Sequence, residues 1–212
     1  MEEFGAPNFR SVGRSAVVLD CAQRDIATQR RLWAIARAAR TWPHVHEAVP
    51  GSGNLTLAFE RDAITYGALR DALARAWADA RDDAAATHTI EIPVCYDGED
   101  LQAVADACGL SIDDVVAVHA SGTYVVSLVG FLPGFAYLDG LDARLQLPRR
   151  AQPRMRVPAG SVGIAGAQSG VYPFDSPGGW HIVGRTALRM FDPSRDPAAL
   201  LQPGDAVRFV SR

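Results

Sequence analysis

The first half of the chain alternates strand-like and helix-like hydrophobic patterns. Residues 15–20 (SAVVLD) form a short run rich in β-branched residues, and apolar positions then recur at helical spacing over residues 25–40. Two further strand-like segments, 44–49 and 55–59, are joined by the turn-forming residues PGSGN. In the second segment, Leu55, Leu57 and Phe59 alternate with smaller or polar residues, which predicts one buried face.

A second helix and another strand complete this pattern. Thr65 is placed to cap a helix whose apolar stripe consists of Leu69, Leu73, Ala76 and Trp77. Residues 89–95 again resemble a strand, so the order is βαββαβ. That order predicts a ferredoxin-like domain with two helices on an antiparallel sheet. A polar stretch of small residues at 80–88 predicts a domain boundary there, with domains at 1–86 and 87–212.

The second half begins with two short helices and continues as a series of short strands. Apolar residues at helical spacing predict a helix over 101–108 that Gly109 ends, and Ser111 with Asp114 forms a capping box for the next helix. From Tyr124 onward the strand-like segments are YVVSLVG, RMRV, SVGIAG, WHIVG, ALRMF and AVRFV. Short strands separated by Gly and Pro turns predict a barrel or sandwich, and the whole chain an α+β fold.

Composition limits where the protein works and what it binds. Hydrophobic residues make up 48% and charged residues 21% of the 212 residues, and no apolar run reaches the ~18 residues of a membrane span. The first ten residues, MEEFGAPNFR, lack the basic start and apolar stretch of a signal peptide, so we expect a cytoplasmic protein without membrane partners. A net charge of -3 argues against a nucleic-acid partner. The three cysteines lack metal-ligand spacing, so no metal is expected.

The basic residues exclude several kinds of chemistry. All 21 are arginine, and the sequence contains no lysine. A Walker A loop, a Schiff-base site and a biotinylated carrier each require a lysine, so this chain cannot contain any of the three. An anion bound here must therefore meet arginine or backbone N–H groups.

The stretch from Arg154 to Trp180 (RMRVPAGSVGIAGAQSGVYPFDSPGGW) contains six glycines and three prolines. Its glycines at 160, 163 and 166 do not match the dinucleotide pattern GxGxxG, and no helix is expected to follow them. Two interpretations stay open. The glycines form tight barrel turns, or their backbone N–H groups form a nest that holds an anion.

Charged and titratable residues in this region have a structural and a functional interpretation. Arg154 and Arg156 point to the same side of an extended strand, which favours either a solvated face or an anion or acidic neighbour between them. His181 beside Trp180 is either structural or an acid or base near neutral pH. The acidic run at 97–100 is more simply the polar entry to a helix than a metal site.

Several longer motifs resemble one known family. These are GFLPGFAYLDGL (130–141), LPRRAQPRMRVPAGSVGIAGAQSGVYP (147–173), SPGGWHIVGRT (176–186) and the closing LQPGDAVRFV. They resemble the KipI family, also described as the B-type subunit of the prokaryotic 5-oxoprolinase, as allophanate hydrolase subunit one and as a carboxyltransferase domain of subdomain C and D type. The resemblance implies a ferredoxin-like N-terminal domain and a cyclophilin-like β-barrel C-terminal domain.

The resemblance also implies a function, partners and a cleft. It implies an ATP-dependent hydrolysis of 5-oxoproline to glutamate together with the C-type and A-type subunits of 5-oxoprolinase, with ATP at a site shared with or supplied by those partners. Two alternatives stay open, a KipI-type inhibitor of a sensor histidine kinase and a carboxyltransferase component acting on urea or allophanate. Catalytic residues are not identified; the candidates for substrate or anion binding are Arg154, Arg156, Ser161, Gly163, Gly166, Gln168, Tyr172, Ser176, Trp180, His181 and Arg185.

Overall fold

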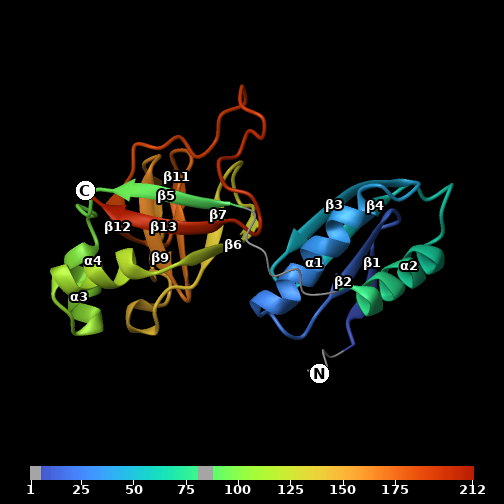
Figure 1. The fold of residues 1–212 in the computed structure, drawn as a ribbon, viewed down its shortest axis with the longest axis horizontal. Coiled ribbons are helices and arrows are strands. Elements are labelled where there is room, and N and C mark those ends of the chain that lie inside the picture. Colours follow the sequence, from blue (N-terminus) through green and yellow to red (C-terminus); the bar gives the residue numbers. More distant parts are fainter. Residues whose placement is uncertain (1–5, 81–87) are drawn as a thin grey trace. The chain divides into compact units, whose positions relative to one another are not determined.

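The computed structural model describes residues 6–80 and 88–212, which divide into two compact units, Met1–Ala85 and Ala86–Arg212 (Figure 1). The expected boundary between residues 86 and 87 lies outside the described residues. Within the described ranges, no helix has the length and apolar composition needed to cross a membrane.

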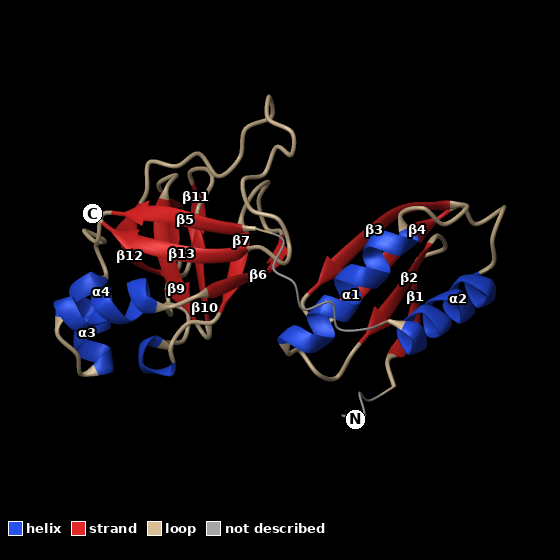
Figure 2. Ribbon diagram, viewed as in Figure 1, coloured by secondary structure: helices blue, strands red, loops and turns tan. Residues whose placement is uncertain are grey.

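The first unit is a four-stranded antiparallel sheet with two helices on it (Figure 2). Its strands follow the order β1-β2-β4-β3. The elements are β1 (Asn8–Val12), β2 (Ala16–Asp20), α1 (Ile26–Ala39), β3 (Val45–Gly51), β4 (Asn54–Phe59) and α2 (Tyr66–Asp79).

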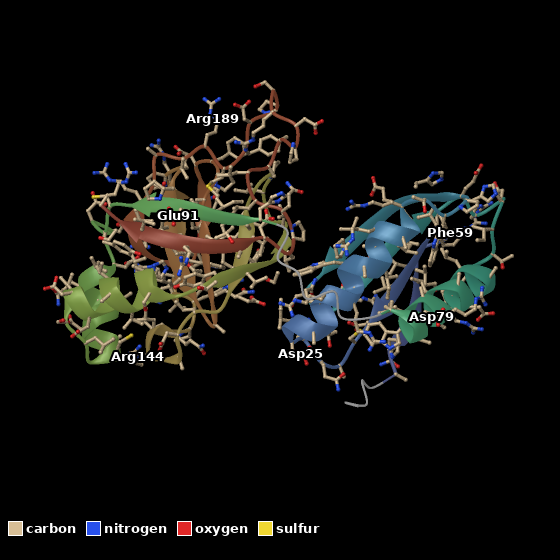
Figure 3. All side chains as sticks on the ribbon, in the orientation of Figure 1. Asp25, Phe59, Asp79, Glu91, Arg144 and Arg189 are labelled. Carbon is tan, nitrogen blue, oxygen red and sulfur yellow. The ribbon has the colours of Figure 1, made fainter. Side chains whose placement is uncertain are left out.

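The helices of this unit begin where the sequence predicts. The side chain of Asp25, labelled in Figure 3, accepts a hydrogen bond from Thr28 N at 2.7 Å, and Thr65 accepts one from Ala68 N at 3.2 Å. Both helices share one core with β2 and β4. In β4 the buried positions are Leu55, Leu57 and Phe59, which confirms the predicted alternation.

The last strand of the predicted βαββαβ order does not belong to this sheet. β5 (Thr89–Val94) pairs with β13 in the second unit, in parallel register from Thr89↔Ala206 to Ser211↔Val94. Ile92 and Val94 of β5 are completely buried in the core of that unit. The fourth strand of the first sheet is instead β1, which pairs with β2 and which the sequence analysis missed, because four of its five residues are exposed and show no alternation.

The second unit is a seven-stranded sheet that closes almost completely into a barrel (Figure 1). Its order is β12-β9-β10-β7-β6-β13-β5, and a bridge between Cys95 and Arg185 joins the two outermost strands. The elements are β5, α3 (Leu101–Cys108), α4 (Ile112–Ser121), β6 (Tyr124–Val129), β7 (Ala136–Asp139), η1 (Ala143–Leu145), β8 (Arg154–Val157), β9 (Ser161–Ala165), β10 (Gln168–Val171), β11 (Ser176–Gly178), β12 (His181–Arg185) and β13 (Ala206–Ser211).

The helix caps predicted for this unit are confirmed, but one predicted strand is not. Gly109 ends α3 in the left-handed region, with φ 66°, and both hydrogen bonds of the Ser111–Asp114 capping box are present. β8 and β11 pair as a separate two-stranded sheet. The segment ALRMF, expected as a strand, contains only an isolated bridge at Phe191, so that expectation was wrong.

Candidate functional site

The glycine-rich stretch makes room for an aromatic cluster. A Cβ at Gly170 would lie 3.1 Å from the Trp180 ring and 3.2 Å from the Phe135 ring, and one at Gly163 would lie 3.2 Å from Trp180 Cβ. The rings of Phe135 and Trp180 meet edge to face, with centroids 5.5 Å apart. A Cβ at Gly178 would collide with the Tyr172 hydroxyl. Close packing of large rings against backbone therefore accounts for three of the six glycines.

Two more glycines of this stretch form turns whose N–H groups are already bonded. Gly160 and Gly166 have φ of 81° and 56°, which glycine adopts without strain. The N–H of Gly160 donates to Tyr172 O at 2.7 Å, and that of Gly166 donates to Leu147 O at 2.7 Å. The structure thus favours the interpretation of barrel turns over an anion-holding nest.

A buried carboxylate gathers two arginines at the start of α3. Asp100 is 3% exposed, and its Oδ1 accepts from Arg150 Nη1 at 2.6 Å and from Arg154 Nη2 at 2.7 Å. Its Oδ2 accepts from Ile182 N at 2.7 Å, and Arg154 also pairs with Glu99 at 2.7 Å. Burial alone would raise the pKa of Asp100, but the hydrogen bonds from Arg154 and Ile182 and the two guanidinium charges lower it overall.

The other two candidate arginines have separate carboxylate partners. Arg156 donates to Asp175 at 2.8 Å and Arg185 donates to Asp97 at 2.8 Å, and both arginine side chains are mostly exposed. The hydrogen bond from Arg185 holds the pKa of Asp97 below its ordinary value. For Asp175, the largest lowering of the pKa comes from the Ala159 N–H, followed by the hydrogen bond from Arg156. Arg154 and Arg156 therefore pair with different carboxylates, whereas the sequence analysis considered a single anion or acidic neighbour between them.

The remaining candidate residues are distributed over several environments. Gln168 donates to Asp139 at 2.7 Å, and His181 Nε2 donates to Pro148 O at 2.9 Å. Ser161 is buried at the start of β9, and the buried Ser176 Oγ has no hydrogen-bond partner among the described residues. These candidates therefore have different hydrogen-bond partners and lie on different strands.

A buried polar network was missed by the sequence analysis. His119 on α4, 1% exposed, has Tyr96 Oη 2.8 Å from Nδ1 and Ser169 Oγ 2.9 Å from Nε2. Ser169 Oγ donates to Gly163 O at 3.2 Å, so every group is satisfied when Nε2 carries the ring proton and Nδ1 accepts from Tyr96. Burial lowers the pKa of His119 to about 3, so the ring is neutral and its role is to join α4 to the barrel. Nothing in the sequence links residues 23 and 50 positions apart.

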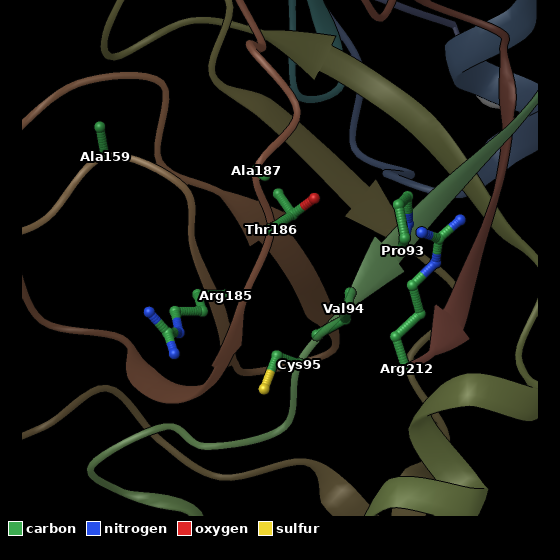
Figure 4. A pocket seen from close by; sticks show the side chains of 8 residues that line it. All are labelled: Pro93, Val94, Cys95, Ala159, Arg185, Thr186, Ala187 and Arg212. Atoms are coloured by element: carbon green, nitrogen blue, oxygen red, sulfur yellow. The ribbon is translucent and has the colours of Figure 1, made fainter.

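A pocket of about 440 Å³ opens where the barrel closes (Figure 4). Only Arg185 among the predicted site residues lines it. Its walls are formed by Pro93, Val94, Cys95, Ala159, Arg185, Thr186, Ala187 and Arg212. Across the described part of the chain, no cluster of three His, Cys, Asp or Glu side chains could hold a metal ion.

The chain is similar to several known proteins. A family model described as "Carboxyltransferase domain, subdomain C and D" matches residues 7–201. The B-type subunit of 5-oxoprolinase from Escherichia coli O157:H7 is 46% identical over 204 residues, which cover 94% of this chain and 93% of that protein. Its counterpart of the same name from Haemophilus influenzae is 41% identical over 207 residues, covering 96% and 97%.

A solved structure extends this similarity to the fold. The crystal structure of TTHA0988 superposes with a TM-score of 0.83 at 38% identity, covering 93% of this chain. This chain spans 39% of that longer chain. The mixed α/β architecture with a nearly closed barrel is therefore shared with a structure of related sequence.

Proposed function

The chain belongs to the family of carboxyltransferase domains of subdomain C and D type, and from this premise we propose that it is the B-type subunit of an ATP-dependent 5-oxoprolinase. The observation that carries the proposal is the sequence similarity, 46% and 41% identity over nearly the whole length, to two proteins named as the B-type subunit of 5-oxoprolinase. The reaction is the opening of the cyclic amide of 5-oxo-L-proline to L-glutamate.

We also propose a fold type for each of the two domains. The sheet order β1-β2-β4-β3, antiparallel throughout and covered by α1 and α2, supports a ferredoxin-like first domain in which β1 takes the place of the last strand. The nearly closed seven-stranded sheet supports a cyclophilin-like barrel as the second domain. Because ATP is a cytoplasmic substrate, we place the assembly in the cytoplasm.

The chemistry calls for groups that the described residues of this chain do not supply. A lactam is a poor electrophile, and transfer of a phosphoryl group from ATP to its oxygen would create a leaving group before water attacks. Such a step needs a phosphate cradle, but the chain has no lysine and the N–H groups of Gly160 and Gly166 are already bonded. Among the described residues, a lysine-containing phosphate loop and a nest at these two glycines are therefore excluded, and we propose that ATP binds on a partner and that the A-type and C-type subunits complete the active site.

Exposed apolar side chains support the need for partners. Phe131 is 60% exposed and adopts φ 72°, and Met155 is 86% exposed, both in the second unit. We propose that Phe131 and Met155 are contact points for a partner, since apolar surface marks an interface where it is part of a contiguous patch.

The experiment measures ATP hydrolysis and 5-oxoproline consumption with this chain and with the A-type and C-type subunits from the same genome. We expect consumption only in the complete mixture with ATP, together with a stable complex on size-exclusion chromatography. Full activity of the other two proteins without this chain would contradict the proposal.

The description of the family model also supports a second function, a carboxyltransferase component, and for it we propose urea or allophanate as the substrate. Since the chain has no lysine, biotin would have to be attached to another protein. Bicarbonate- and biotin-dependent carboxylation of urea by the assembled proteins, without 5-oxoproline turnover, would select this alternative.

A further inference from the structure

The pocket at the barrel seam has a rigid frame. Cys95 N donates to Arg185 O at 2.9 Å, and Arg185 N donates to Cys95 O at 2.8 Å, so both strands that form the pocket are locked in register. A Cβ at Gly184 would lie 2.6 Å from Cys95 O, so this approach requires glycine. The side chains of Cys95 and Arg185 are therefore presented from fixed backbone positions.

The polar groups of the pocket are suited to an anion. Arg185 engages Asp97 through Nε and Nη2, which orients the guanidinium and leaves other N–H groups of the fork to donate to a ligand. Thr186, 9% exposed, accepts from Leu188 N at 3.2 Å, so its hydroxyl proton is available to donate. Arg212 lies on the other side of Val94 and Cys95 from Arg185 (Figure 4). Guanidinium and hydroxyl donors together match a carboxylate.

The remaining walls select a compact ligand. Pro93, Val94, Ala159 and Ala187 offer apolar surface, which suits the methylene groups of a small ring. None of the eight described residues that line the pocket is aromatic, so a nucleotide base would find no ring to stack on. A small carboxylic acid with an apolar body fits these features better than a nucleotide does.

We propose that this pocket binds a small organic acid through its carboxylate, with Arg185 and Thr186 as donors, and that the acid is 5-oxoproline. The choice of acid rests on the proposed function, whereas the pocket and its preference for a carboxylate do not. Arg185 is thus a substrate-binding residue of this chain, and Asp97 orients it.

Cys95 provides a direct probe of occupancy. Its side chain is exposed in the pocket, while Cys21 is buried and Cys108 half-buried. Alkylation of the whole chain with iodoacetamide, followed by peptide mass spectrometry, reports the rate at Cys95 by itself. A ligand that blocks the thiol slows the reaction by the factor 1 + [L]/Kd, about elevenfold at ten times its Kd.

The wild-type chain is tested with three ligands at matched ionic strength. We expect 5-oxoproline to slow alkylation of Cys95, and 2-pyrrolidinone, the same ring without the carboxylate, to leave the rate unchanged. Equal protection by inorganic phosphate would mean an adventitious ion only and would overturn the proposal. Unchanged alkylation with 5-oxoproline would overturn it as well.

A matched pair of variants locates the effect. Arg185→Gln should lose the protection. Arg189→Gln should keep it, because Arg189, labelled in Figure 3, is similarly exposed and also paired with an aspartate but is not among the residues that line the pocket. Protection that survives Arg185→Gln would refute the assignment. The two proposals fail separately: turnover in the complete mixture without protection removes this pocket alone, and protection without turnover removes the 5-oxoprolinase function alone.

Discussion

Replacing Asp100 by asparagine tests whether the buried carboxylate organises this side of the barrel. Asparagine preserves the size of the side chain and can still accept from Ile182 N, but it removes the charge that faces Arg150 and Arg154. The side chain of Asp100 is 5% exposed, and those of Arg150 and Arg154 are 32% and 17% exposed. The variant therefore leaves two largely buried guanidiniums without their shared counter-charge.

The cost follows from this burial. Removing one partner of a buried ion pair destabilises a protein by about 3–5 kcal/mol, and we expect the lower end, about 3 kcal/mol, because Arg154 keeps Glu99 and Arg150 is partly solvated. The difference in free energy of unfolding between the wild type and the variant depends on pH. Because the folded-state pKa of Asp100 lies below its ordinary 3.8, the stabilisation that its charge provides is complete above pH 3.8 and is lost as pH falls through the folded-state pKa.

The assay is urea unfolding at pH 7, monitored by pulsed hydrogen exchange and mass spectrometry of peptides from residues 88–212, so that the second unit is measured by itself. The matched control is Asp175→Asn, because Asp175 also accepts from a backbone N–H and from one arginine but is exposed to solvent. The control should lose no more than about 1 kcal/mol. Equal losses of free energy of unfolding for both variants would refute the reasoning from burial.

Three further changes have defined outcomes. His119→Gln should flatten the pH dependence of unfolding, because a ring with a folded pKa of about 3 and an ordinary value of 6.5 removes about 1.4 kcal/mol of stability per unit as pH falls between those values; an unchanged slope in urea titrations would contradict this. Gly170→Ala should lower the melting temperature because the added methyl group crowds Trp180. Gly67→Ala, which adds a methyl group in open space on α2, should instead raise the free energy of unfolding by about 0.5–1 kcal/mol and so raise the melting temperature. Equal shifts of the melting temperature in calorimetry would contradict the packing account. Phe131→Ser should weaken binding to the partner subunits by about tenfold or more with little change in stability, and unaltered affinity in calorimetric titration would exclude Phe131 from the interface.

The sequence predicted features that depend on neighbouring residues. The cap at Thr65, the capping box at Ser111 and the alternation in β4 all arise from contacts within a few positions. Such local signals fix where elements begin and end, and they were confirmed.

Features that depend on distant pairing could not be predicted in this way. β5 has the same hydrophobic pattern whichever sheet it joins, and only its parallel register with β13 assigns it to the second unit. Asp100 meets arginines 50 and 54 positions away, so the acidic run at 97–100 resembled a helix entry rather than the neutralising partner of predicted anion-binding arginines. The glycine-rich stretch was recognised as unusual, but its cause, the rings of Trp180 and Phe135, required the fold.

The most direct test of the central claim is the release of glutamate from isotopically labelled 5-oxoproline with ATP, comparing the complete mixture of this chain with the A-type and C-type subunits to the mixture that lacks only this chain. We predict glutamate in the first and none above background in the second. Equal release in both mixtures, or none from a complete mixture whose three proteins are folded and associated, would contradict the assignment of this chain as a 5-oxoprolinase subunit.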